Sequence, residues 1–215
     1  MMSTWHRVAI LVAALTAAGQ CCAEPGPRVA EPLVAGIAER NGGELRLTAS
    51  NGTTVTLADE NGCDDGPAHC AQHTLVSHDT AHRAFIVRNT YYESDDYSWV
   101  SDETGAKVDI KGMPHFSPNG DLIAVAVPSE CCGFSGLQIW RVQAEIPVLE
   151  WQHEPQDYWL FDFVTWRGNR TVILSATTHV GGKFEGKLVE GLKASLNFVG
   201  GSAKWQLIRP EQARR

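Results

Sequence analysis

The fold is decided by residues 114–126, which read PHFSPNGDLIAVA. Pro118, Asn119 and Gly120 predict a tight turn, because Pro fixes φ and Gly adopts positive φ without steric conflict. The strand after the turn, 121–127, carries small apolar residues on both faces, which is typical of an inner strand that is covered on both sides. Phe116 precedes the turn, where an aromatic ring can pack between neighbouring sheets. This stretch therefore predicts a strand, a tight turn and a buried strand.

The same frame recurs in the chain. Residues 166–176 (WRGNRTVILSA) match it at an offset of 50, and residues 78–87 (HDTAHRAFIV) match it at an offset of 38. Two further strands joined by a tight turn follow each copy: 97–101 with 107–110, 137–142 with 147–151, and 192–199 with 204–209. A similar hairpin, 45–49 with 53–57, precedes them all. The pattern predicts a four-stranded unit repeated about four times, with a first copy short of one or two strands.

Strand signals dominate the rest of the chain, and no window after Glu24 keeps a helical period for three turns. The predicted strands are 44–49, 53–57, 83–89, 98–101, 107–110, 121–127, 137–142, 148–152, 159–165, 171–176, 193–199 and 204–208. Short strands with regular turns predict an all-β, β-propeller-like fold, with a β-sandwich as the alternative.

One unit resembles a known repeat. Residues 114–126, followed by 137–142 (LQIWRV), are similar to the WD40-like PD40 repeat of TolB-type β-propellers, which has Asp where this chain has Asn119. The resemblance implies that Pro114 to Val142 forms one propeller blade. It implies no particular activity, because propellers host enzymes, ligand binders and scaffolds alike.

The first 23 residues predict a secretory signal peptide. His6 and Arg7 form a short basic start, an apolar run covers 8–18, and small residues end at Ala23. Cleavage before Glu24 fits best, and cleavage before Gln20 is the alternative. Cys21 follows Gln20 and Cys22 follows Cys21, which argues against a lipoprotein anchor. We expect a periplasmic or secreted protein whose single domain spans 24–215.

Four cysteines remain after such cleavage: Cys63, Cys70, Cys131 and Cys132. An even number in an exported chain predicts disulfides. The pairing Cys63–Cys70 with Cys131–Cys132 is favoured because nearby residues meet easily, and two cross-links between the loops are the alternative. The spacing of Cys63 and Cys70 is not a zinc spacing, so neither a metal site nor a cofactor is predicted.

Composition narrows the function classes. The chain has 215 residues, of which 43% are hydrophobic and 20% charged, and a formal net charge of −7. That length supports one domain with a full core. No apolar run after the N-terminus approaches the roughly 20 residues of a membrane-spanning helix. The acidic balance argues against nucleic-acid binding.

Strand alternation places five connections at one end of the predicted sheets: 58–72, 90–96, 128–136, 153–158 and 177–191. We call this the loop end. Its candidate binding residues are aromatic or acidic: Tyr91, Tyr92, Glu93, Asp95, Asp96, Phe134 and Tyr158. Long loops with aromatic residues on a rigid scaffold are a usual place for binding. The sequence thus predicts an exported, non-catalytic binding module whose partner is an envelope or secreted protein, and it does not indicate an oligomeric state.

Two alternatives stay open. A glycan-active hydrolase would need two carboxylates about 5–10 Å apart in a pocket, and the candidates are Asp95, Glu130 and Asp157. An inhibitor of another enzyme would need one protruding loop. The chain contains no G-x-S-x-G, H-E-x-x-H or phosphate-binding motif, so no catalytic residue is assigned.

Overall fold

The computed structural model describes residues 30–61, 70–92, 94–130, 133–143, 145–179, 187–200 and 204–210. The predicted signal peptide lies outside this part. The described part is all-β, as predicted, and contains no helix that could span a membrane. Its strands are β1 (Ala38–Asn41), β2 (Glu44–Thr48), β3 (Thr54–Ala58), β4 (Glu60–Asn61), β5 (Cys70–Asp79), β6 (Ala84–Tyr91), β7 (Asp95–Ser101), β8 (Lys107–Ile110), β9 (His115–Phe116), β10 (Leu122–Val127), β11 (Gly136–Arg141), β12 (Val148–His153), β13 (Trp159–Trp166), β14 (Thr171–His179), β15 (Leu188–Val199) and β16 (Lys204–Ile208).

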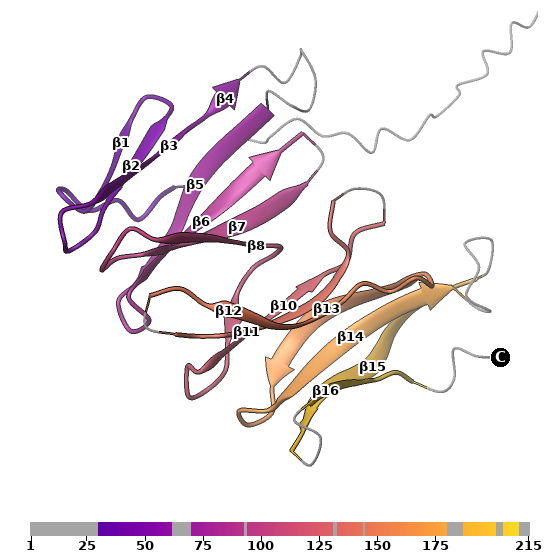
Figure 1. The fold of residues 1–215 in the computed structure, drawn as a ribbon. Coiled ribbons are helices and arrows are strands. Elements are labelled where there is room, and N and C mark those ends of the chain that lie inside the picture. The colour runs from indigo at the N-terminus through magenta and orange to yellow at the C-terminus, as the bar shows by residue number, and fades with distance from the viewer. Residues whose placement is uncertain are drawn as a thin grey trace, which may run out of the picture.

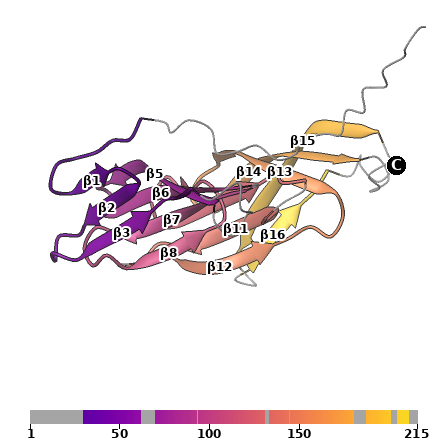
Figure 2. The same ribbon diagram turned by 90° about the horizontal axis from the view of Figure 1, so that it is seen from above.

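The strands form four antiparallel sheets in chain order: β1–β3, β4–β8, β9–β12 and β13–β16. We call them the first to the fourth sheet. Strands that follow one another in the chain are neighbours in each sheet, so every sheet is a meander. The sheets lie in a row, with the first and the fourth at opposite ends of the molecule, and none closes on another (Figures 1 and 2).

About four units were predicted, and the structure confirms that number. The expectation of four strands in each holds for the third and fourth sheets and is wrong for the second, which gains β4 as a fifth strand. The first sheet has three strands, as expected for a shortened copy. All four predicted hairpins are present, as β2–β3, β7–β8, β11–β12 and β15–β16.

Among the described residues, three hydrophobic cores hold the row together, one between each pair of consecutive sheets. Leu45 and Leu47 of β2 pack with Phe85 of β6 between the first and second sheets. Trp99 of β7 belongs to the core between the second and third sheets. The core between the third and fourth sheets is built from these residues: Leu122, Ala124, Leu137, Ile139, Trp159, Phe161, Val172, Leu174, Ala176, Ala194, Leu196 and Trp205. Each core thus joins only neighbouring sheets.

Strand β10 serves two of these cores, as its sequence predicted. Ile123 and Val125 enter the core shared with the second sheet, while Leu122 and Ala124 enter the core shared with the fourth. Successive side chains of a strand point to opposite faces, so an apolar run suits a strand that is covered on both sides. Phe116 packs between sheets, because its ring stacks on His82 of the second sheet at 3.9 Å.

The predicted offset of 50 between the third and fourth units holds for the aromatic residues before the turn, but it is wrong by one residue for the strands after the turn, β10 and β14. Phe116 pairs with Ile123 in the third sheet, whereas Trp166 pairs with Val172 in the fourth. The aromatic residues are therefore 50 apart, but their strand partners are 49 apart, because the second turn is one residue shorter. A shift of one residue exchanges the two faces of a strand. The predicted offset of 38 between the second and third units pairs residues on the same face of their strands. Phe85 and Ile123 both point to the preceding sheet.

The outward face of the first sheet is polar, and that of the fourth sheet is mixed, since Ile208 is 52% exposed there. Buried Leu45 and Leu47 alternate with Arg46, which points away from the core on β2. On the fourth sheet, Asp162, Ser175 and Lys193 are cross-strand neighbours that lie outside the core residues of their strands. A polar outward face allows a row of repeated units to end in solvent, as the first sheet does.

Candidate binding pocket

Two of the predicted loop-end connections, the β6–β7 turn and the β10–β11 connection, lie side by side. A Cβ atom built on Gly133, in the β10–β11 connection, would lie 3.1 Å from Cβ of Ser94 in the β6–β7 turn. Connections of the second and third sheets are therefore in contact at this end.

The predicted recognition loop 90–96 is mostly strand. β6 continues to Tyr91 and β7 begins at Asp95, so residues 90, 91, 95 and 96 belong to strands. The backbone N–H of Tyr91 donates to the carbonyl of Ser94 at 2.8 Å, which closes the hairpin. The apolar alternation of β6 stops at Asn89, and for this reason the sequence placed the strand end too early.

Side chains of this hairpin bind one another. Arg88 donates to Asp95, and the Tyr91 hydroxyl donates to Asp96 at 3.3 Å. Asn89 is 1% exposed and also donates to Asp96, at 2.7 Å. Burial raises the pKa of Asp96, and burial together with Asp96 raises the pKa of Tyr91 to about 12. Tyr91, Asp95 and Asp96 thus stabilise the hairpin, and their role in binding stays a prediction.

The remaining candidates are spread over the loop end. Tyr92 and Phe134 are half-buried, and neither lines the pocket described next. Glu93 lies outside the described residues. Tyr158 is 53% exposed and lines that pocket.

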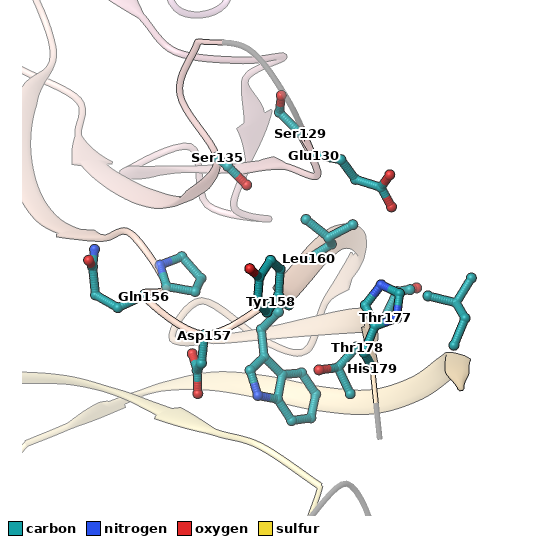
Figure 3. Close-up of a pocket in the computed structure, with 13 residues that line it drawn as sticks. Ser129, Glu130, Ser135, Gln156, Asp157, Tyr158, Leu160, Thr177, Thr178 and His179 are labelled. Atoms are coloured by element: carbon teal, nitrogen blue, oxygen red, sulfur yellow. The ribbon is translucent and has the colours of Figure 1, made fainter. Parts of the chain in front are cut away.

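A pocket of about 290 Å³ opens at the loop end between the third and fourth sheets (Figure 3). One side comes from the β10–β11 connection and the other from the β12–β13 connection with the ends of β13, β14 and β15. The lining residues are Ser129, Glu130, Ser135, Pro155, Gln156, Asp157, Tyr158, Trp159, Leu160, Thr177, Thr178, His179 and Leu188. Two of the three carboxylates considered for a hydrolase, Glu130 and Asp157, are therefore in one pocket, whereas Asp95 is not part of it.

Aromatic rings form part of the wall that faces the β10–β11 connection. The ring of Tyr158 meets His179 edge to face, with 6.2 Å between centroids. Figure 3 shows Glu130 on the opposite side of the opening from Tyr158 and His179. Trp159 is 8% exposed and begins β13 directly after Tyr158, which anchors the connection in the core.

Arg209 supports this wall from behind. It donates to the carboxylate of Asp157 at 2.7 Å and to Nε2 of His153 at 3.0 Å. Its guanidinium also lies 5.5 Å from the centroid of the Trp159 ring. Burial and the Arg209 charge lower the pKa of His153, so this ring accepts the hydrogen bond in its neutral form. One cation thus fixes both the strand end and the connection next to the pocket.

Thr178 and His179 were missed as site residues because residues 177–191 were predicted to be a loop. β14 in fact continues to His179, and β15 begins at Leu188. The alternation of Val172, Leu174 and Ala176 continues to Thr178, which was the available signal. Thr178 is 1% exposed, and its hydroxyl has no hydrogen-bond partner among the described residues.

Cys70 is 1% exposed at the start of β5 and is disulfide-bonded. Cys63, Cys131 and Cys132 lie outside the described residues, so the predicted pairing stays a prediction. The described residues include no group of His, Cys, Asp and Glu that could hold a metal ion.

Comparison with known proteins adds no identity, because no family model, no curated protein and no solved structure matches this chain.

Proposed function

We propose that this protein is an exported, non-catalytic binding module that recognises an envelope or secreted protein at its loop end. The observation that carries the proposal is the pocket between the third and fourth sheets, with Tyr158 exposed in its wall. We also propose that the four sheets are blades of a short, open β-propeller-like row.

The surroundings of the pocket support a binding role. The wall opposite the β10–β11 connection comes from the ends of hydrogen-bonded strands and from a connection that Arg209 holds. A rigid wall loses little conformational entropy when a partner binds. Tyr158 supplies a large contact area with few rotatable bonds, and such residues dominate binding energy at interfaces.

The test compares Tyr158→Ala with Val164→Ala, since Val164 is exposed to the same degree, at 54%, but does not line the pocket. Both proteins are immobilised and exposed to envelope extract, and the captured protein is quantified. We expect Tyr158→Ala to reduce capture of one defined protein about fivefold or more, with an unchanged Tm. Equal capture by both variants would overturn the proposal.

A glycan-active hydrolase is the second candidate, because Glu130 and Asp157 line the same pocket as Tyr158. One carboxylate oxygen of Asp157 already accepts a hydrogen bond from Arg209, which ties it to a structural role. Release of reducing sugar from envelope glycans that Glu130→Gln abolishes would favour this function. An inhibitor that uses residues 180–186 would rely on a segment outside the described residues.

A further inference from the structure

The pocket is the open end of a hydrophobic core. Val172, Leu174 and Ala176 of β14 face the third sheet, and Thr178 is the next residue on that face. At this level the pocket of about 290 Å³ lies between the two sheets, and Thr178 is part of its lining. Sites for small ligands start near this volume, so the pocket fits a single side chain or a molecule of similar size.

The charge around the pocket is negative. Glu130 and Asp157 line it, and no Lys or Arg belongs to its described lining. Arg209 pairs with Asp157, whereas Glu130 is exposed and forms no ion pair with another described residue. A carboxylate in this position attracts a cation and repels an anion.

The wall opposite Glu130 suits a cation as well. Figure 3 shows Tyr158 and His179 across the opening from Glu130. A guanidinium or ammonium group gains energy when it lies over an aromatic face, more so when it is partly shielded from water.

Thr178 is not explained by folding alone. Its neighbours on the same face are apolar, and a valine of the same shape would fill the position without burying a hydroxyl. A buried hydroxyl without a hydrogen bond destabilises a protein, so its presence in a pocket wall points to a ligand that supplies a donor. A cation carries donors and no acceptor, which matches both Glu130 and Thr178.

We propose that the pocket binds a cationic side chain, arginine or lysine, of a partner protein. Glu130 is its counter-ion, the ring of Tyr158 lies along it, and Thr178 accepts a hydrogen bond from it. The inference rests on the proposed function, since it names the chemistry by which the loop end recognises that partner.

The test is a titration of protein expressed from the full chain with the capped tripeptide acetyl-Gly-Arg-Gly-amide, followed by ¹⁵N NMR. The matched probe replaces arginine with citrulline, which has the same shape but no charge. We expect shifts of residues around Tyr158 and His179 with the arginine peptide, and binding at least about tenfold weaker with citrulline.

Three variants locate the contacts. Glu130→Gln and Thr178→Val should each weaken binding of the arginine peptide about fivefold or more. Thr178→Val should not lower the Tm, because the hydroxyl that it removes is buried and bonds nothing in the free protein. Glu154→Gln removes the same charge from the neighbouring connection without touching the pocket lining, and it should leave affinity unchanged.

Equal binding of both peptides would overturn the inference, and so would unchanged affinity in both Glu130→Gln and Thr178→Val. Agmatine binding as tightly as the peptide would also overturn it, because the ligand would then be a small free cation and not a side chain of a protein. The extract experiment remains separate. Capture that depends on Tyr158 together with a silent peptide titration would refute the cationic contact and leave the binding module standing.

Discussion

At the scale of single residues, the most buried ion pairs among the described residues join the first two sheets. Arg40 binds Glu31 at 2.6 Å and lies 3.7 Å from Asp59, with only 10% of its side chain exposed. The two carboxylates also accept backbone N–H groups of β5: Glu31 from Leu75 and Asp59 from His73. Removal of the Arg40 side chain would leave the nearly buried carboxylates of Glu31 and Asp59 without their cationic partner.

We therefore predict that Arg40→Ala lowers the free energy of unfolding by about 3–5 kcal/mol, measured by urea titration. Arg46→Ala is the matched control. Arg46 pairs with Glu44 on the surface, with half of its side chain exposed, and its loss should change stability by less than about 1 kcal/mol. Similar losses in both variants would show that burial of the Arg40 cluster does not matter.

We predict that the free energy of unfolding depends on pH through His115. Its ring stacks on Phe163 with 3.8 Å between centroids, and burial lowers its pKa from 6.5. The unfolded chain therefore binds a proton at His115 more readily than the folded protein does. The stability that neutral His115 contributes is complete above pH 6.5 and is lost as the pH falls through 6.5 toward the folded-state pKa.

The measurement is the free energy of unfolding at about pH 7.5 and about pH 5.5. His115→Phe keeps an aromatic ring and removes the titrating group, so the loss of stability between the two pH values should be smaller in the variant. An identical loss in both proteins would assign the effect to other groups, such as His153, whose pKa is also lowered.

At the scale of elements, two turns with glycine at positive φ form a natural comparison. Gly120 (φ 77°) and Gly168 (φ 61°) occupy the turns before β10 and β14. A Cβ atom on Gly120 would lie 2.6 Å from Nε2 of His82, while one on Gly168 would have no atom within 4 Å. The first turn therefore holds a ring of the preceding sheet in place, and the second does not.

Alanine at Gly168 should lower the free energy of unfolding by about 1–2 kcal/mol through backbone strain alone. Gly120→Ala should lower it further, because it also displaces His82 from its stack on Phe116. Thermal and urea denaturation of the two variants gives the difference. A smaller loss for Gly120→Ala would mean that the stack does not link the sheets.

Strands with an alternating or continuous apolar pattern could be predicted from the sequence, and strands with polar faces could not. β10 and β14 were found because their side chains fill the cores. β5 carries His73, His78 and Asp79 and packs partly against polar groups, so its pattern is weak. The pocket was missed in part for the same reason, since Thr178 ends an apolar row with a hydroxyl. The pocket itself also depends on how the connections of two sheets are placed in space, which a strand pattern does not give.

At the scale of the whole molecule, each end sheet is covered on one face and each middle sheet on two. We predict that amides of β2 exchange hydrogen at least about tenfold faster than amides of β10, since opening the first sheet breaks one core and opening the third breaks two. Mass spectrometry of exchanged peptides measures both strands in one experiment. Equal protection would mean that the row unfolds as one cooperative unit.

The open row also bears on how such a chain can change in length by gene duplication. A closed ring of sheets fixes the number of its units, because the angles between them must add up to a full circle. Here each core is shared by two consecutive sheets, and the copies 38 residues apart keep the same faces toward their neighbours. Duplication of such a segment would add one sheet and one core and leave the remaining sheets undisturbed. The number of sheets is therefore free to vary among descendants of this gene, whereas a ring would permit only a few values.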